Sequence, residues 1–486
     1  MQFSQSRREA LLAGSAALTA LMATALMSTA SHAQTDSAGP VVTGPITGGD
    51  KGWIYRAPAM DLAAVGYVVE EFFVSGTARS FKFADGHSAE FDGDWAAEPD
   101  EAAPFATRIF VVRPSDPARY NGVLLAHWQN VSAGYENGWP TGEEIYSGYA
   151  WMAVSAQADG VNGGRNKEQY GLRQWDPARY GALSHPGDAY SYDIFASAVS
   201  QALARSAEGP GGPLADLKTD KVLALGGSQS ALRLATFVNA VHPHRKIFDG
   251  FLLLSHFGVA SPLEERSLAS LFDLAGGTRN AAWSRVADRG DVPVMVVDTQ
   301  AESLMHYPAR QPDTDSFRTW QIAGAPHAPP SATAMKNRAG ERDGVVDAGG
   351  DQQGRNLVEW GYVSDAAIRF LARWMKEGEA PPRFDLLAID VSGPRPAYAL
   401  DAVGNVLGGI RPPEVAAAVG VHSAGLADLL GRSVLFDRAR MIELHGDRDG
   451  FLRSWGAAVD ALQEAGLLLP KQREPLLARA GDYWPA

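Results

Sequence analysis

The fold of this chain is decided by the stretch Lys221-Val222-Leu223-Ala224-Leu225-Gly226-Gly227-Ser228-Gln229-Ser230. Its first five residues form an apolar run with the length of a buried strand, and residues 231–240 have apolar side chains at helical spacing. A serine on a tight turn between a strand and a helix, with small residues two positions away on each side, is typical of a nucleophile elbow.

The turn of such an elbow forces the serine backbone into a strained conformation, so positions 226 and 230 must be small for the strand and the helix to approach. Ser230 stands where glycine is more usual, which makes this a degenerate form of the motif. A structural role for Ser228 is an alternative, because serine is also a favoured N-cap residue of helices.

An acid and a histidine follow the serine in chain order. The apolar run 292–297 ends in a polar loop with Asp298 and Glu302, and the run 317–322 is followed by Ala323-Gly324-Ala325-Pro326-His327. The order serine, acid, histidine, each just past a strand, is that of the α/β-hydrolase triad. We therefore predict Ser228 as nucleophile, His327 as base and Glu302 as acid. Asp298 is the alternative acid, because it lies directly at the strand end.

The predicted chemistry explains why these residue types are needed. A serine hydroxyl is a weak nucleophile until a neighbouring imidazole takes its proton, and a carboxylate behind the imidazole stabilises the cation that forms. The developing oxyanion needs donors aimed at it. We expect one from the backbone N–H of Gln229, and the second from the loop after the strand over 122–126, around Asn130 and Val131.

Strand-like runs alternate with helical segments along most of the chain. This pattern predicts an α/β-hydrolase fold with a mostly parallel sheet covered by helices on both faces. Residues 50–375 are expected to form the core, with an antiparallel hairpin over 66–82, a helix over 188–205 capped by Asp188 and another helix over 357–375. An insertion at about 258–291 is expected to act as a cap. Residues 376–486 form a C-terminal extension packed on the core, with a hairpin over 401–411 and a helix over 456–469.

The N-terminus indicates export. Paired arginines, Arg7 and Arg8, precede a moderately apolar stretch, and small residues at 31–33 supply a cleavage site. Residues 1–33 therefore read as a twin-arginine signal peptide, and residues 34–49 as a mobile leader. An uncleaved N-terminal anchor is the alternative. The predicted location is periplasmic or secreted.

Composition excludes several classes of function. The chain has no cysteine, which excludes thiolate zinc sites and a cysteine nucleophile. Its formal charge of −13 is spread along the sequence and argues against nucleic-acid binding. No second apolar segment is long enough to span a membrane. We predict no metal and no cofactor; His242 and His244 lie close together, but on a predicted loop after a helix, exposed to solvent.

Several motifs together resemble a known family. They are the elbow itself, residues 127–132 after the third strand, residues 180–193 before the long helix, residues 323–327 and residues 404–411. With them the chain resembles the large secreted α/β-hydrolase-domain proteins of bacteria, whose elbow has the form Gly-x-Ser-Gln-Ser. The resemblance implies a serine hydrolase with Ser228 as nucleophile and His327 as base. Of the two acidic positions usual in that family's acid loop, the first is Gln300 here and the second is Glu302.

These observations predict a periplasmic serine hydrolase that cleaves a carboxylic ester through an acyl-serine intermediate. Its substrate would be a small-molecule or polymeric ester. A lactonase, an amidase or a polyester depolymerase with the same triad is one alternative. A non-catalytic binding protein on a hydrolase scaffold is another.

Overall fold

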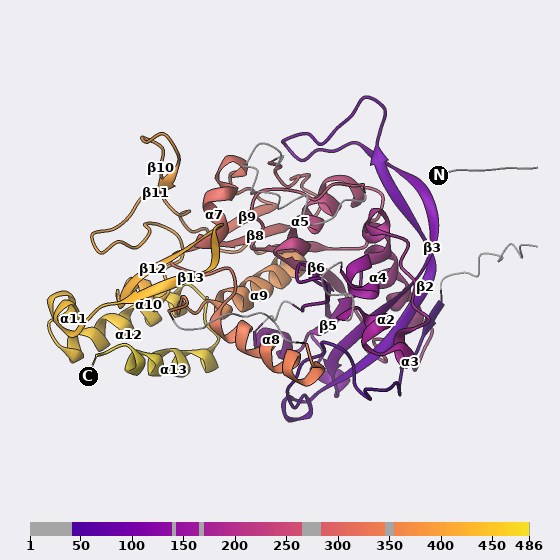
Figure 1. The fold of residues 1–486 in the computed structure, drawn as a ribbon, viewed down its shortest axis with the longest axis horizontal. Coiled ribbons are helices and arrows are strands. Elements are labelled where there is room, and N and C mark those ends of the chain that lie inside the picture. The colour runs from indigo at the N-terminus through magenta and orange to yellow at the C-terminus, as the bar shows by residue number, and fades with distance from the viewer. Residues whose placement is uncertain (1–40, 139–141, 165–169, 265–282, 346–353, 486) are drawn as a thin grey trace, which may run out of the picture. The chain divides into compact units, whose positions relative to one another are not determined.

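Nine strands form one central sheet in the part of the chain that the computed structural model describes, which is residues 41–138, 142–164, 170–264, 283–345 and 354–485 (Figure 1). These strands are β1 (Val41–Thr43), β2 (Tyr67–Phe83), β3 (Ala97–Pro114), β4 (Val123–Trp128), β5 (Ala150–Val154), β6 (Lys221–Gly227), β7 (Gly250–Leu254), β8 (Val294–Thr299) and β9 (Phe317–Ile322).

The strand order across the sheet is β1-β2-β3-β5-β4-β6-β7-β8-β9. β1, β2, β3 and β5 are joined by antiparallel pairing, whereas every pair from β5 to β9 is parallel. Because parallel strands end at the same edge, the loops after β4, β6, β8 and β9 meet at one side of the sheet. The predicted mostly parallel sheet is confirmed.

Alternate residues of the central strands face two different cores. On β6, Leu223 and Leu225 belong to one hydrophobic cluster, and Val222 and Ala224 belong to the other. Side chains of a strand point alternately to opposite faces, so a strand covered on both sides is apolar throughout. This is why β6 and β7 appear in the sequence as apolar runs, whereas β9, at the edge of the sheet, alternates apolar with polar residues.

Helices cover both faces of the sheet. The first cluster includes apolar residues of α9, and the second includes those of α4 and α5. The α-helices are α1 (Ala158–Asn162), α2 (Leu172–Trp175), α3 (Pro177–Tyr180), α4 (Ser191–Ala207), α5 (Gln229–Thr236), α7 (Gln300–His306), α8 (Pro330–Asp343), α9 (Gly361–Glu377), α10 (Pro413–Ala416), α11 (Arg438–His445), α12 (Arg448–Glu464) and α13 (Pro470–Ala478). Short 3-10 turns lie at Ala63–Val65, Pro117–Arg119, Glu144–Tyr146, Asp188–Tyr190, Tyr307–Ala309 and Arg479–Asp482, and a π-helix over Phe237–Val241 continues α5.

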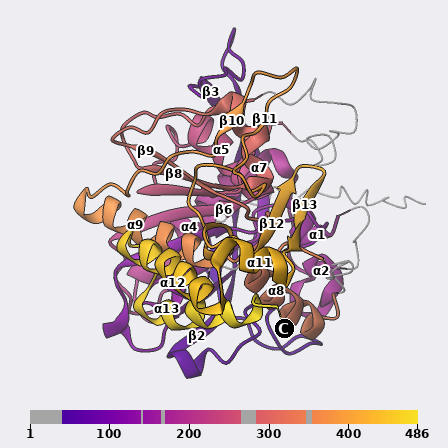
Figure 2. The same cartoon turned by 90° about the vertical axis from the view of Figure 1, so that its left-hand side faces the viewer.

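The C-terminal part of the chain adds two small two-stranded sheets and a group of helices. The strands are β10 (Ile389–Asp390), β11 (Ala397–Tyr398), β12 (Gly420–Gly425) and β13 (Asp428–Leu435). Figure 2 shows this part facing the viewer, with α12 and α13 below the β12–β13 hairpin. Trp455, Leu462 and Leu476 from these helices belong to the same hydrophobic cluster as α9 and the sheet.

Two expectations at the sheet edge are corrected. Residues 66–82 do not form a hairpin by themselves, because β2 is one long strand that pairs with β3 along most of its length. The predicted mobile leader over 34–49 is wrong from residue 41 onward, because β1 pairs with β2 and the N–H of Ile46 donates to the carbonyl of Glu71. Residues 34–40 lie outside the described residues, as does the predicted signal peptide.

Three expectations in the C-terminal half are also corrected. The helix predicted over 357–375 begins at Gly361, and Leu357 before it is exposed. Residues 401–411 form a turn with one isolated bridge between Leu400 and Val406 rather than a hairpin. The helix predicted over 456–469 is the second half of α12, which ends at Glu464 because Gly466 has a φ of 73°.

The insertion predicted at 258–291 falls largely on residues 265–282, which lie outside the described residues. Its two ends meet in an isolated bridge between Val259 and Trp283. Among the helices that the structure describes, none has a stretch long and apolar enough to cross a membrane.

Candidate active site

Ser228 occupies a strained turn between β6 and α5. Its φ of 56° and ψ of −123° lie outside the regions that residues with a side chain ordinarily occupy. The turn is held because the N–H of Ser228 donates to the carbonyl of Leu254 on β7, at 2.8 Å. The strand and the helix approach so closely that a side chain on Gly226 would begin 2.9 Å from the backbone of Ser230. Ser228 thus lies on a strained turn between a strand and a helix.

Ser230 can stand where glycine is more usual because its side chain bonds to the backbone of the turn. Its hydroxyl oxygen accepts a hydrogen bond from the N–H of Gly227 at 2.9 Å, and its O–H lies 2.9 Å from the carbonyl oxygen of the same residue. The side chain is fully buried. It therefore satisfies backbone groups at the turn that glycine would leave to other partners.

Glu302 lies beside His327. Nδ1 of His327 is hydrogen-bonded to Oε1 of Glu302, and Oε2 of Glu302 accepts from the N–H and the hydroxyl of Thr299 at 2.8 and 2.6 Å. The bond from the backbone N–H of Thr299 is half of a capping box at the start of α7. Glu302 is therefore in the first turn of a helix, not in the polar loop that the sequence predicts, and the helix fixes the direction of its carboxylate.

Asp298 faces another histidine. Its Oδ2 is hydrogen-bonded to Nδ1 of His306, and its Oδ1 accepts from the backbone N–H of His256 at 2.7 Å. Burial alone would raise the pKa of Asp298, but His306 and the N–H donor hold it below its usual value. The structure thus brings Glu302, and not Asp298, to His327.

A single segment connects the elbow with the histidine loop. Leu254 accepts from the N–H of Ser228, and the hydroxyl of the next residue, Ser255, donates to the carbonyl of His327 at 3.4 Å. The ring of Phe257 lies 5.5 Å from the His327 ring, between ring centres. Ser255 and Phe257 have φ values of 55° and 68°, so this segment is itself strained.

The predicted oxyanion residues lie next to each other. Gln229 is the first residue of α5, where a backbone N–H has no acceptor within the helix. The N–H of Val131 donates to the side-chain oxygen of Gln229 over a long 3.4 Å. The side chain of Asn130 donates to the carbonyl of Gly227 at 2.9 Å, which ties the loop after β4 to the elbow.

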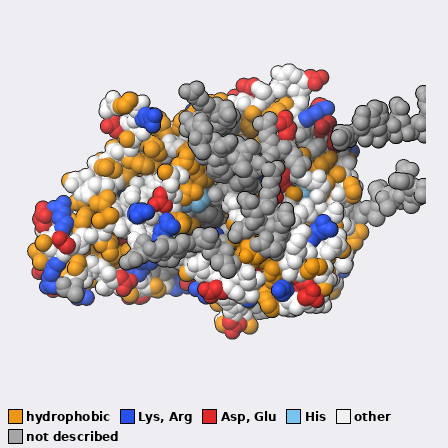
Figure 3. All heavy atoms as spheres, viewed as in Figure 1, with side chains coloured by type: hydrophobic (Ala, Val, Ile, Leu, Met, Phe, Trp, Pro, Cys, Tyr) orange, Lys and Arg blue, Asp and Glu red, His pale blue; other side chains and the backbone are white. Residues whose placement is uncertain are grey.

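The C-terminal extension contacts the same segments. The N–H of His327 donates to the carbonyl of Leu429 on β13 at 2.9 Å. The hydroxyl of Tyr398 donates to the carbonyl of Gln300 and accepts from the N–H of Leu304 at 2.9 Å, so it holds both ends of the first turn of α7. Figure 3 shows hydrophobic side chains gathered over the left part of the view, where Figure 1 has β10 to β13.

The chain matches the family model described as the alpha/beta hydrolase domain over residues 42–478. The chain belongs to the alpha/beta hydrolase domain family. No curated protein sequence matches it. Solved structures similar to this hydrolase domain share little sequence with it. The esterase Est22 is 13% identical, with 58% of this chain and 78% of that chain covered and a TM-score of 0.32. Oligopeptidase B from Leishmania major is 12% identical, with 59% and 37% covered and a TM-score of 0.30.

Several residues around the site of this hydrolase domain are not indicated by its sequence pattern. Gln157 accepts from the side chains of Gln229 and Trp128 at 2.9 and 3.0 Å and so anchors Gln229. Its only signal is its place just after the strand over 150–154. No sequence pattern points to His306 and His256, because their roles depend on where Asp298 lies in space.

Two predicted structural roles are corrected. Asp188 does not cap the long helix that follows it, because a 3-10 turn separates it from α4. Its carboxylate instead pairs with Arg233 at 2.9 Å and accepts from the N–H of Ala158 at 2.9 Å. His242 is buried at the end of the π-helix with its ring against Phe251, not on an exposed loop. Among the described residues, no three metal-ligating side chains lie close enough to share an ion.

Proposed function

We propose that this chain is a serine hydrolase that cleaves carboxylic esters through an acyl-serine intermediate. In the first half of the reaction, the Ser228 oxygen attacks the ester carbonyl carbon while Nε2 of His327 takes the hydroxyl proton. The tetrahedral adduct then collapses, the alkoxide leaves with the proton from His327, and the acyl group remains on Ser228. In the second half, His327 takes a proton from water, the hydroxide attacks the acyl carbon, and the carboxylic acid departs as Ser228 regains its proton.

The contact between Glu302 and His327 is the observation that carries this proposal. A carboxylate on Nδ1 keeps that nitrogen protonated, which leaves Nε2 as the base. It also stabilises the imidazolium that forms in each half-reaction. Because Glu302 is buried and fixed by Thr299, little reorganisation is needed when the charge develops.

The oxyanion is assigned to the N–H groups of Gln229 and Val131. At 3.4 Å, the bond from Val131 to the Gln229 side chain is longer than ordinary N–H···O bonds. We expect the negatively charged oxygen of the tetrahedral adduct to replace the neutral side-chain oxygen as the acceptor, because charge-assisted hydrogen bonds are about twice as strong as neutral ones. Gln157 then retains the displaced Gln229 side chain, because Nε2 of Gln229 donates to the side-chain oxygen of Gln157.

The surroundings of His327 support an ester with an apolar group. Leu232, Phe257 and Val259 form a buried hydrophobic cluster, with Trp283, Met305 and Leu429 packed against it. The Phe257 ring joins this cluster to the His327 ring. We therefore propose a substrate whose acyl or alcohol part is hydrophobic. Because of the paired arginines near the N-terminus, we also propose that the enzyme is exported and acts in the periplasm.

A fluorophosphonate probe tests the reaction type, because it reacts only with an activated serine. The wild-type chain is expected to be labelled at Ser228 and to hydrolyse p-nitrophenyl butyrate. Ser228→Ala should lose both properties while its circular dichroism spectrum is retained. Absence of labelling in the folded wild-type chain would refute the proposal. A panel of esters, lactones and amides of matched size then identifies the bond that is cleaved fastest.

A further inference from the structure

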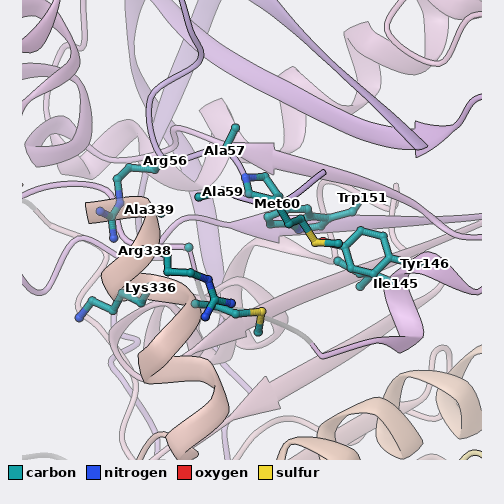
Figure 4. A pocket seen from close by; sticks show the side chains of 13 residues that line it. Arg56, Ala57, Ala59, Met60, Ile145, Tyr146, Trp151, Lys336, Arg338 and Ala339 are labelled. Carbon is teal, nitrogen blue, oxygen red and sulfur yellow. The ribbon is translucent and has the colours of Figure 1, made fainter. Parts of the chain in front are cut away.

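A pocket separate from the triad lies between the segment 56–60, the 3-10 turn before β5 and helix α8. It measures about 620 Å³ including its open mouth. Figure 4 shows Arg56 and Arg338 at the side of the pocket that α8 forms, and Met60, Tyr146, Ile145 and Trp151 gathered at the opposite side. One end of the pocket is thus cationic and the other is apolar.

Arg56 is the feature that points to a ligand. The residue is only 5% exposed, and its Nη2 donates to the side chain of Asn137 at 3.1 Å. Its Nε and Nη1 are buried and have no acceptor within the described residues. A buried guanidinium with two unused donors is costly unless an acceptor reaches it.

The carboxylate of Asp343 contacts the backbone of Arg56 and not its guanidinium. Asp343 accepts from the backbone N–H of Arg56 at 3.0 Å, and its oxygens pair with the side chain of Arg342 at 2.8 and 3.2 Å. These contacts hold Arg56 in a left-handed conformation, with a φ of 58°, and the Tyr135 ring lies 5.6 Å from its guanidinium. The side chain is therefore positioned by the fold.

A second cation raises the positive potential of this end. Lys336 on α8 also lines the pocket, and burial together with the charge of Arg56 lowers the pKa of its ammonium to about 8. A negative charge between the two groups would relieve their repulsion. Arg338 from the same helix lies at the surface.

At the apolar end of the pocket, the indole of Trp151 has no free hydrogen-bonding group. The Nε1 of Trp151 donates to Nδ1 of His127 at 3.2 Å, so the residue presents only ring carbons to the pocket. Ile145 and Met60 complete this wall. Such a surface binds hydrocarbon.

We propose that this pocket binds an amphipathic carboxylate, with its carboxylate on the free N–H groups of Arg56 and its alkyl chain against Met60, Ile145 and Trp151. Arginine suits this role because its charged N–H groups form strong hydrogen bonds with carboxylate oxygens. Binding at this site is independent of chemistry at Ser228, so it goes beyond the proposed hydrolysis. A carboxylic acid is nevertheless what ester cleavage releases, and the pocket would sense that class of product.

Isothermal titration of octanoate into the purified full-length chain tests the proposal. Octanoate is expected to bind, whereas acetate lacks the chain and 1-octanol lacks the charge, so each should bind about tenfold more weakly or worse. Arg56→Gln should weaken octanoate binding about tenfold or more. The matched surface variant Arg453→Gln, at an exposed position of α12 that does not line the pocket, should change it far less. Equal binding of octanoate to wild type and Arg56→Gln would overturn the proposal, as would equal binding of octanol and octanoate.

Two further measurements keep the test decisive if Arg56→Gln does not fold. Met60→Glu places a carboxylate at a partly exposed position of the apolar wall and should weaken octanoate binding; unchanged binding would overturn the proposal. Wild-type protein labelled at Ser228 with a fluorophosphonate should still bind octanoate. Loss of binding after labelling would show that octanoate binds at the catalytic site, and would reject this pocket. The labelling itself reports separately on the proposed function.

Discussion

Asp298 is hydrogen-bonded to His306, whereas the acid four residues further along the chain, Glu302, is hydrogen-bonded to His327. The two acids therefore serve two different histidines. Asp298 also accepts from the N–H of His256, so it fixes the strained segment whose Phe257 packs against the His327 ring. We infer that Asp298 positions this segment and that Glu302 acts on the base.

Separate replacement of the two acids should distinguish these roles. Glu302→Gln is expected to lower kcat for p-nitrophenyl butyrate by about a thousandfold or more, because the base loses its charged partner. Asp298→Asn should cost less than about tenfold in kcat but lower the free energy of unfolding by about 1–3 kcal/mol, because a buried charge-assisted bond is lost. Steady-state kinetics and urea unfolding give both quantities. A larger loss of kcat in Asp298→Asn than in Glu302→Gln would contradict the assignment.

Gly226→Ala tests the close approach at the elbow. The new methyl group would begin 2.9 Å from the backbone of Ser230, so the strand and helix must separate. We expect a loss of about 1–3 kcal/mol in unfolding free energy and a clear drop in kcat. The matched control is Gly456→Ala within α12, where nothing lies within 4 Å of the new carbon. That change should stabilise the chain by up to about 1 kcal/mol, since alanine favours helix. Similar effects of the two changes would argue against a steric requirement at Gly226.

Tyr398→Phe tests the link between the C-terminal extension and the acid. The change removes the hydroxyl that bonds Gln300 and Leu304 on either side of Glu302. We expect unfolding free energy to fall by about 1–2 kcal/mol, and kcat to fall several-fold while KM changes little. Tyr120→Phe is the control, because its hydroxyl contacts Thr219, away from α7. If both variants keep full kcat, the extension does not help to position Glu302.

Glu144 predicts a pH dependence of stability. Burial raises the pKa of its carboxyl from about 4.5 to about 7, although Arg369 acts in the opposite direction. A carboxyl with a raised pKa binds its proton more tightly in the folded state. Its contribution to stability is therefore present below pH of about 4.5 and is lost as pH rises through about 7.

The neutral variant Glu144→Gln removes this dependence. The unfolding free energy of wild type minus that of Glu144→Gln should fall by about 1–3 kcal/mol between pH 4.5 and 7. Urea unfolding at several pH values measures the difference. Subtracting the two free energies removes the contribution of buried histidines such as His127. Burial lowers the pKa of His127 to about 3, so its effect on stability has the opposite sign. A flat difference across this range would show that Glu144 is charged in the folded chain.

Much of the core could be predicted because each parallel strand is covered on both faces. Residues 221–225 and 250–254 therefore appear as apolar runs, and the elbow follows the first of them. The edge was harder to predict, because the strand Val41–Thr43 is short and is set by its pairing with β2. The start of α9 was misplaced for a similar reason: the N–H of Leu357 donates to Ser433, which holds the chain out of helix.

The choice between Asp298 and Glu302 could not be made from residue spacing alone. Both follow β8, and the difference depends on where His306 and His327 lie in space. Glu302 was expected in a loop because its capping partner, Thr299, is also the last residue of the strand. The positive φ values of Ser255 and Phe257 could not be predicted from the sequence, because neither residue is glycine.

The backbone bond between His327 and Leu429 has a consequence for biosynthesis. The serine and the acid leave the ribosome long before the hairpin that carries Leu429. A nascent chain that stops short of this hairpin holds every residue of the proposed triad but lacks a partner for its histidine loop. Hydrolytic competence should thus appear late in translation, and a stalled or prematurely terminated chain should be inert.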